Sequence, residues 1–347
     1  MSIGTAPQPY APSLIDRLTQ WVRDRIRPAW AFYAGLGIVL IALQVFFLWV
    51  DGGLYFDVLL PIIIFNSLGL GYLLALIDIL DAQATAALSA MGPTLILDSR
   101  EAEGLRFRLA TMPSRPAFLA GLAMVALLIA TELGGIVPLR YAALEALPLF
   151  AVVYQILDKL VAFCMGAFVY HTVRQLRWVN TILTSHTQID LFNPKSIYSF
   201  SKLTASTAIG LIGGIYGWMI LNPELLANPV GLGGALVLTV LALLVFVWPL
   251  LGAHRQMEKE KERILHEIDH LFQSVFSAFN QKLGAQDFPA AEQLNGILAS
   301  LEIQHRKIKG LPTWPWRMET ARSVIAAVVL PLIVRILQFV GDELIRR

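Results

Sequence analysis

Charged residues and cysteines are scarce in this sequence. Asp, Glu, Lys and Arg make up 15% of the 347 residues, and Cys164 is the one cysteine. A soluble domain carries about 25% charged residues, so the shortage argues against a soluble globular protein. A single cysteine excludes an internal disulfide bond. The net charge of +2 comes without a basic patch interleaved with aromatic residues, so we expect no nucleic-acid partner.

Motifs of soluble enzymes are missing as well. The sequence contains no glycine-rich phosphate loop, no nucleophile elbow and no Cys/His spacing of a structural zinc site. The first 28 residues lack the apolar core and the cleavage site of a signal peptide. We therefore expect no large soluble catalytic domain, and we expect the first apolar segment to act as an uncleaved insertion signal.

Apolar residues, in contrast, are in excess: they make up 56% of the chain and fall in long runs. A helix needs about 20 mainly apolar residues to cross a bilayer. The segments that meet this condition are 29–50, 54–80, 116–138, 148–172, 204–222 and 229–252. The sequence therefore predicts an all-α, polytopic integral membrane protein whose residues 29–252 form a six-helix domain in the lipid bilayer.

Lys and Arg are distributed unevenly among the connections between these segments. They gather in the N-terminal segment 1–28, in the loops 81–115 and 173–203, and in residues 254–322. Segments of this kind stay on the cytoplasmic side of a membrane. We therefore expect a bacterial or archaeal cytoplasmic (inner) membrane and a cytoplasmic N-terminus. The first and third spans both begin with Arg-Pro, at Arg27 and Arg115, which leaves open whether the helical hairpins are repeats.

After the sixth span the pattern becomes amphipathic. Residues 253–318 are predicted to form a cytoplasmic antiparallel helical hairpin, in which Ile264, Ile268 and Val275 recur at coiled-coil spacing. Such a hairpin suits a cytoplasmic protein partner bound within 254–310, and we also expect a homo-oligomer. Residues 319–347 are predicted to form an interfacial or re-entrant helix, because Pro331 and Arg335 interrupt the apolar segment 323–341. A seventh crossing by that segment stays open.

Residues 264–272 read ILHEIDHLF and contain a literal H-E-x-x-H at His266 and His270. On a helix this spacing brings two imidazoles together beside a carboxylate, as in zinc metallopeptidases. Both histidines point away from the apolar stripe, and a third ligand has to come from Glu292, Glu302 or His305. Three interpretations follow: a zinc peptidase, a non-catalytic metal or pH-sensing site, and a solvated helix face. We favour the last, and zinc is the one cofactor under consideration.

Two ionisable residues, Asp158 and Lys159, lie in the middle of the fourth span. Each costs about 3 kcal/mol or more at the bilayer centre, so such residues mark transport pathways or buried pairs. Gln155 lies one turn from Lys159, and counting along the helices puts three further polar residues at similar depth: Asn66, Tyr216 and Thr239. We expect a polar midplane site for an ion or substrate; a structural hydrogen-bond network is the alternative.

The fifth span carries small residues at four-residue spacing. Ser206, Gly210 and Gly214 form one row, and Gly213 and Gly217 form a second. Small residues at this spacing let two helices approach closely. We expect this face to pack against another helix, of the same chain or of a neighbouring subunit.

Transport is the function that this pattern favours. We expect an oligomeric ion channel or carrier with Asp158 and Lys159 in its path, and in an anion channel Arg335 lies near the cytoplasmic mouth. A membrane scaffold or sensor that uses the hairpin is the first alternative, and a membrane-bound zinc metallopeptidase is the second. An enzymatic activity is uncertain, and we favour its absence.

Overall fold

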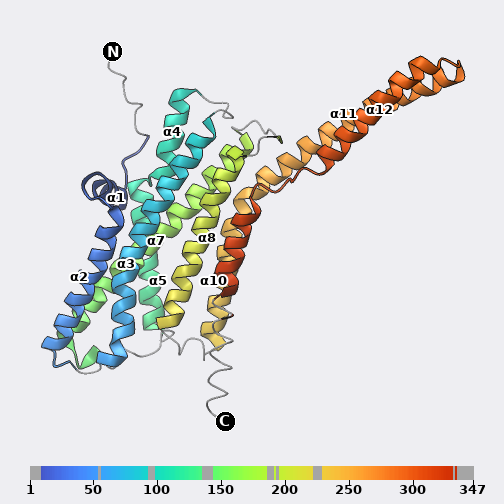
Figure 1. The fold of residues 1–347 in the computed structure, drawn as a ribbon. Helices are drawn as coiled ribbons and strands as arrows, with labels where there is room; N and C mark the ends of the chain where they lie inside the picture. The colour runs from blue at the N-terminus through green and yellow to red at the C-terminus, as the bar shows by residue number, and fades with distance from the viewer. Residues whose placement is uncertain are drawn as a thin grey trace, which may run out of the picture.

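The structure is a computed structural model that describes residues 9–53, 56–92, 98–134, 144–185, 191–192, 195–221, 229–330 and 333. These residues are almost entirely helical. No strand occurs among them, and an isolated antiparallel bridge pairs Pro12 with Pro113. The helices pack side by side into a bundle, and a long two-helix arm projects from one end of it (Figure 1).

The helices follow one another in this order: α1 (Leu14–Arg25), α2 (Ala29–Val50), α3 (Phe56–Ala90), α4 (Ser99–Ala110), α5 (Ser114–Leu133), α7 (Pro148–Ser185), α8 (Lys195–Leu221), α10 (Pro229–Val247), the 3-10 turn η2 (Trp248–Leu250), α11 (Leu251–Gly284) and α12 (Phe288–Lys309). A further helix covers residues 318–330.

Six helices are long and apolar enough to cross a membrane: α2, α3, α5, α7, residues Ile197–Leu221 of α8, and the continuous stretch Gly233–Gly284. The chain is therefore an all-helical, multi-pass integral membrane protein, and this coarse prediction from the sequence is confirmed. Helices α3 and α7 have 35 and 38 residues, or about 53 and 57 Å at 1.5 Å per residue. Because a bilayer core is about 30 Å thick, both helices continue beyond it.

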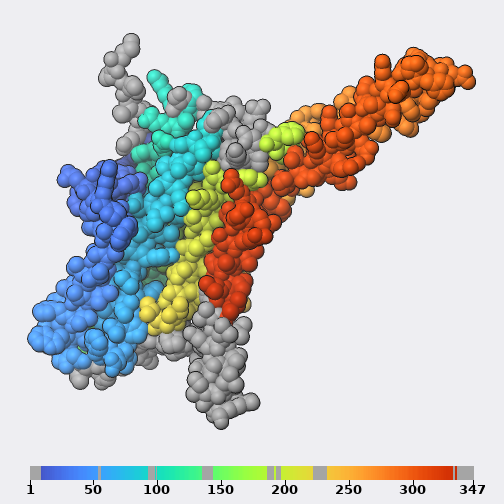
Figure 2. Space-filling model, in the orientation of Figure 1, coloured from blue at the N-terminus to red at the C-terminus, as the bar shows by residue number. Residues whose placement is uncertain are grey.

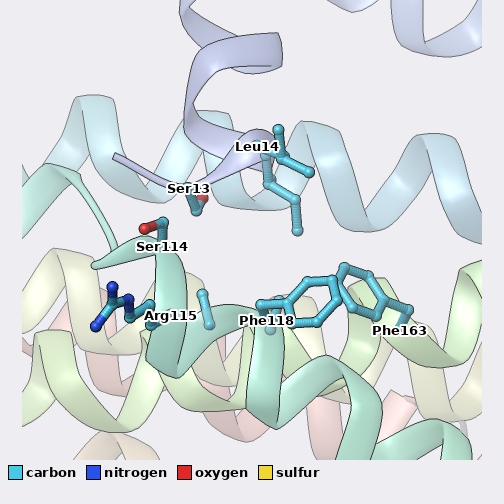
Figure 3. A pocket seen from close by; sticks show the side chains of 9 residues that line it. Ser13, Leu14, Ser114, Arg115, Phe118 and Phe163 are labelled. Atoms are coloured by element: carbon cyan, nitrogen blue, oxygen red, sulfur yellow. The ribbon is translucent and has the colours of Figure 1, made fainter. Parts of the chain in front are cut away.

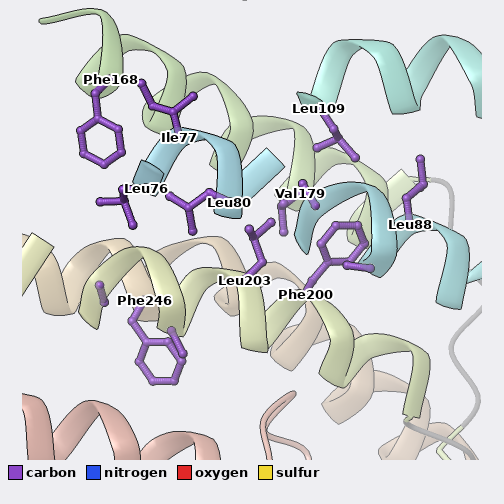
Figure 4. Close-up of a cluster of buried hydrophobic side chains, with 14 of the residues drawn as sticks. Leu76, Ile77, Leu80, Leu88, Leu109, Phe168, Val179, Phe200, Leu203 and Phe246 are labelled. Atoms are coloured by element: carbon purple, nitrogen blue, oxygen red, sulfur yellow. The ribbon is translucent and has the colours of Figure 1, made fainter. Parts of the chain in front are cut away.

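Helix α3 is the centre of the bundle. It contacts α1, α2, α4, α7 and α8, while α5 packs on α7 and α10 packs on α8. Its buried side chains Leu76, Ile77 and Leu80 meet those of α7 and α8, such as Phe168 and Leu203, in the main hydrophobic core (Figure 4). This central position explains why 56% of the residues in the most apolar 18-residue segment of α3 are buried. In the corresponding segment of α5, 11% are buried.

The end of the bundle that carries α1, α4 and the base of the arm is called the upper end below (Figure 1). Helix α1 begins there with a capping box, in which Ser13 and Asp16 satisfy each other's backbone N–H groups. The bridge places the start of α1 beside the start of α5, because Ser13 N donates to Met112 O at 3.0 Å and Ser114 N donates to Ala11 O at 3.1 Å.

The arm is formed by α11 and α12, which run antiparallel (Figure 1). Ile268, Leu301 and Ile308 are buried between them. At the base of the arm, His254 stacks on Trp314 with ring centroids 3.9 Å apart, and Lys261 Nζ donates to the carbonyl oxygens of Lys309 and Leu311 at 2.7 and 2.8 Å. The space-filling view shows the rest of the arm standing clear of the bundle (Figure 2).

The helix of residues 318–330 runs beside the bundle next to α10 (Figure 1). Val324 is buried in the main core, and Trp316, just before this helix, contacts Phe246 of α10 with ring centroids 5.2 Å apart. Of the segment 331–347, only residue 333 is described. The prediction of an interfacial or re-entrant helix, and the position of Arg335, therefore fall mostly outside the described residues.

Candidate functional site

Asp158 and Lys159 belong to a polar cluster built by α3, α5 and α7, called the Lys159 cluster below. Lys159 Nζ donates to Gln155 Oε1 at 2.9 Å, to Asp158 Oδ2 at 3.1 Å and to the carboxylate of Glu132. Asn66 Nδ2 lies 3.5 Å from Asp158 Oδ1. The structure thus brings Asn66, Gln155, Asp158 and Lys159 together and adds Glu132.

The Lys159 cluster is partly buried and carries one cation against two carboxylates. The side chains of Lys159, Glu132 and Asp158 are 23%, 18% and 17% exposed. Neighbouring residues on a helix do not face each other, yet the long Lys159 side chain reaches the Asp158 carboxylate. Lys159 therefore pairs with both acidic side chains and offsets part of their charge, which lowers the cost of holding them in a bilayer.

Two of the residues expected at this site take other positions. Thr239 Oγ1 donates to Ala235 O of its own helix, α10, at 2.8 Å. Tyr216 is half-buried on α8, and within the described part of the chain it forms no hydrogen bond with Asp158 or Lys159. Residues at a similar depth in the bilayer therefore need not touch, because the packing of the helices decides which side chains meet.

A second polar cluster, which the sequence did not predict, lies at the upper end between α1, α3 and α7. Its members are Asp16, Asp81, His171 and Gln175, called the His171 cluster below. His171 Nε2 lies 2.7 Å from Asp81 Oδ1, and these side chains are 2% and 1% exposed. Gln175 Nε2 donates to Asp81 Oδ1 at 3.3 Å and to Leu109 O at 2.9 Å.

Two polar atoms of the His171 cluster are left without a hydrogen-bond partner. They are His171 Nδ1 and Asp16 Oδ1, and both are buried. Asp16 and Arg174 are the other charged groups that act on His171, and Asp16 and Arg23 act on Asp81 in addition to the histidine. Buried polar atoms normally have a partner, so these two have capacity for a proton or a water molecule.

Arginine side chains link the helices and the N-terminal segment around the His171 cluster. Arg23 of α1 pairs with Asp78 of α3 at 2.6 Å. Arg174 of α7 donates to the carbonyl oxygens of Arg108 and Thr111 at 2.7 and 2.6 Å and to Tyr10 Oη at 2.5 Å. These bonds hold the N-terminal segment and α4 against the upper ends of α3 and α7.

The sequence contained a signal for the His171 cluster, but it was weak. The predicted spans ended at 80 and 172, so Asp81 was counted as a loop residue. The helices run on to Ala90 and Ser185, so His171 and Gln175 share one face of α7 at a spacing of four residues. The apolar pattern did not predict that α3 and α7 continue as helices beyond their apolar segments.

An apolar layer separates the two clusters along the contact between α3 and α7. From Asp158 to His171 the chain advances 13 positions, which is about 20 Å along a helix. Leu70, Leu74 and Ile77 of α3 and Cys164 and Phe168 of α7 are buried in this interval. Neither cluster therefore forms part of a continuous polar path along this contact.

His266 and His270 lie on α11 in the arm, far from both clusters. Their Nε2 atoms are 3.1 Å apart, and both side chains are exposed. Glu267 is paired with Arg263 at 2.5 Å. In the described ranges, no group of three His, Cys, Asp or Glu side chains is placed to hold a metal ion. The geometry gives the peptidase hypothesis no support, and metal binding by the two histidines stays a prediction.

The three candidates for a third zinc ligand are not placed beside His266 and His270 as a metal site requires. His305 Nε2 lies 3.6 Å from Asp269 Oδ1, Glu302 pairs with Arg306 at 2.7 Å, and Glu292 is exposed. A solvated helix face remains the simplest interpretation of the H-E-x-x-H pattern.

The small residues of α8 lie partly against α3. A Cβ atom on Gly210 meets Leu76 Cδ1 at 2.6 Å, one on Gly213 meets Tyr72 Oη at 3.2 Å, and one on Gly214 meets Tyr72 Cε1 at 3.6 Å. Tyr72 Oη also donates to Gly210 O at 2.5 Å. A Cβ atom on Gly217 meets nothing within 4 Å, and Ser206 is half-buried. The close approach at Gly210 is thus made within one chain.

These features define the class of the protein: a multi-pass helical membrane protein with ionisable side chains buried in its bundle. Comparison with family models, with curated proteins and with solved structures found no match. The function therefore has to be argued from the polar clusters themselves.

Proposed function

We propose that this protein is a membrane transporter of the carrier type, and that the His171 cluster takes up and releases a proton during transport. The observation that carries the proposal is the Asp81–His171 contact of 2.7 Å between two almost fully buried side chains of α3 and α7. Ionisable residues buried in a membrane bundle are costly, and chains of Asp, Glu and His serve as proton relays in pumps and transporters.

Histidine is the side chain whose protonation changes most readily near neutral pH. His171 can carry one proton on Nε2, which faces Asp81, and a second proton on its unpartnered Nδ1, and Asp16 has an unpartnered carboxylate oxygen. A proton added to this cluster changes how strongly α1, α3 and α7 attract one another. That change gives a physical route from protonation to helix movement.

The Lys159 cluster is the second proposed protonation site of the carrier. Its carboxylates outnumber its cation, and protonation of Glu132 weakens the ion pair with Lys159 that joins α5 to α7. The buried apolar layer between the clusters argues for a carrier, since an open channel needs a continuous wet path. Transport by this arrangement requires α3 and α7 to move relative to each other.

The test is proton flux into proteoliposomes that contain a trapped pH-sensitive dye. A potassium gradient and valinomycin impose the membrane potential, and proton entry is followed by dye fluorescence. The proposal predicts faster acidification than in protein-free vesicles. It also predicts that Asp81→Asn and His171→Gln reduce the rate to that of protein-free vesicles.

The arm supplies a matched control. Asp269 and His305 form a His–Asp contact of 3.6 Å outside the bundle, with side chains 58% and 36% exposed, so Asp269→Asn and His305→Gln are expected to keep the full rate. Lys159→Gln tests the other cluster independently and is expected to slow the flux. Equal rates for the wild type and protein-free vesicles, or full rates in both buried-pair variants, would refute proton transport.

A second function is favoured by the arm, namely assembly of the protein with a second copy of itself. Phe272, Phe276 and Leu283 on α11 are 37%, 47% and 39% exposed, and the two phenyl rings are nearly parallel with centroids 6.1 Å apart. These three residues are called the arm stripe below. Exposed apolar surface of this kind marks protein interfaces.

The identity of the proposed partner follows from charge. Residues 271–281 contain no charged side chain, and Lys282 beside Leu283 is paired with Asp287 at 3.0 Å, so two copies of the arm stripe can face each other with little like-charge repulsion. Charge depletion and aromatic enrichment are also typical of interface cores. Two copies in one membrane project their arms on the same side, which raises their effective concentration. This candidate predicts a dimer that is lost when the arm stripe is removed.

A further inference from the structure

A cavity opens at the upper end of the bundle, between the starts of α1 and α5 and the middle of α7. Its volume is about 260 Å³. Small-molecule sites usually measure about 300–1,000 Å³, so this cavity suits one segment of an elongated ligand. Its lining is mainly apolar and includes Leu14, Phe118 and Phe163, with Ser13, Ser114 and Arg115 as the polar members (Figure 3).

The apolar part of the cavity is formed by two aromatic rings. Phe118 and Phe163 meet edge to face, with ring centroids 5.5 Å apart and an interplanar angle of 65°. Leu14 closes this part from α1, and the side chains of Leu14 and Phe118 are 69% and 49% exposed. The aromatic pair lies at one side of the cavity and Arg115 at the other (Figure 3). The cavity is therefore amphipathic along its length.

The surroundings of the cavity match the boundary of a membrane. Leu14, Leu18 and Trp21 are exposed along one side of α1, at the spacing of a helix that lies in a bilayer interface. Arg17 and Arg25 on the same helix are exposed as well. Interfacial helices with this composition are attracted to anionic lipids.

We propose that the cavity binds an anionic phospholipid, with part of an acyl chain against Leu14, Phe118 and Phe163 and the headgroup phosphate at Arg115. An arginine guanidinium matches a phosphate geometrically and binds it through two parallel hydrogen bonds. A free anion at Arg115 would leave the apolar side of the cavity unfilled, whereas an acyl chain fills it. The site shares no residue with either polar cluster, and its lining residue Ser13 donates a hydrogen bond to Asp16 of the His171 cluster. Lipid binding and proton transport are therefore tested with separate variants.

The test is lipid retention by the delipidated full-length protein in detergent, measured by native mass spectrometry. Dioleoyl phosphatidylglycerol and dioleoyl phosphatidylcholine are added separately at equal concentration. The wild type is expected to retain the first phosphatidylglycerol molecule at lower lipid concentration than the first phosphatidylcholine molecule. Arg115→Gln is expected to lose this preference, and Leu14→Ser is expected to weaken retention of both lipids.

Arg100→Gln is the matched control, because Arg100 is an exposed arginine of α4 at the same end of the bundle. It is expected to behave like the wild type. Equal retention of phosphatidylglycerol by Arg115→Gln and the wild type would overturn the proposal, and so would equal retention of the two lipids by the wild type. Displacement of phosphatidylglycerol by inorganic phosphate would show that the site takes a free anion and would refute the lipid. Asp81→Asn and His171→Gln are expected to retain lipid normally, which separates this test from that of transport.

Discussion

At the scale of single residues, the two carboxylate oxygens of Asp16 have different surroundings. Its Oδ2 accepts hydrogen bonds from Ser13 N at 3.0 Å, from Ser13 Oγ at 2.9 Å and from Met112 N at 2.8 Å. Its Oδ1 is buried without a partner. Burial raises the pKa of Asp16 above the ordinary value of 3.8, against the opposing effects of the Met112 N–H, the charge of His171 and the bonds from Ser13.

The raised pKa determines how stability varies with pH. Because the folded state binds the proton more tightly than the unfolded state, the stabilisation is fully present below the unfolded pKa and is lost as the pH rises through the folded pKa. Asp16→Asn keeps one oxygen acceptor and cannot ionise. We therefore expect its thermal midpoint to fall less than that of the wild type as the pH rises above the ordinary carboxyl pKa of 3.8.

Asp24→Asn is the control for this prediction, because Asp24 is an exposed carboxylate on the same helix. It is expected to keep the pH dependence of the wild type. If Asp16→Asn and the wild type lose stability in parallel, Asp16 does not contribute to the pH dependence.

At the scale of helices, α5 and α7 approach each other closely at Gly166. A Cβ atom there runs into the carbonyl oxygen of Ala120 and lies 2.7 Å from Met124 Cβ. Because one of the obstacles is backbone, the two helices have to move apart to admit even a methyl group. Close crossings of this kind are a main source of helix association in membranes.

Gly166→Ala is therefore expected to destabilise the protein by about 1–3 kcal/mol, the usual cost of overpacking. Gly69→Ala is the matched control, since Gly69 is half-buried on α3 and a Cβ atom there meets nothing within 4 Å. Alanine forms helix better than glycine by about 1 kcal/mol, so the control is expected to be neutral or slightly stabilising. Thermal unfolding followed by circular dichroism measures both, and equal midpoints would show that the crossing tolerates a methyl group.

At the scale of the whole molecule, the arm is the part through which we expect two copies of the protein to assemble. Most of its length stands away from the bundle (Figure 2), and its base is held separately by the contacts of His254 and Lys261. Ile264 and Ile308 lie in the same apolar cluster near that base. A short Gly-Ser linker that joins Leu265 to Lys307 therefore removes the arm stripe without disturbing the bundle.

This shortened chain is expected to remain folded and to be monomeric in detergent by light scattering, while the full chain is dimeric. Phe272→Ser combined with Phe276→Ser is expected to do the same with the arm intact. Ile303→Ser is the control, because Ile303 is 54% exposed but lies on α12 outside the arm stripe. A monomeric full chain, or a dimer that survives loss of the arm stripe, would contradict assembly through the arm.

The sequence by itself determined the class of the protein and the course of its long helices. Six apolar segments predicted six helices long enough to cross a membrane, and the structure has them. This part was predictable because a helix satisfies its own backbone hydrogen bonds in a bilayer, so length and apolarity alone select it. Polar residues that lie within one turn on one helix, such as Gln155 and Lys159, were also found together as expected.

Only the tertiary structure decided which ionisable residues meet between helices. Asp81 and His171 are 90 positions apart, and Lys159 and Glu132 are 27 positions apart. The rotation and vertical offset of two packed helices decide such contacts, and side-chain packing across the interface sets both quantities. The periodicity of one helix states which face is apolar, but it does not state which residue of another helix lies opposite a buried charge.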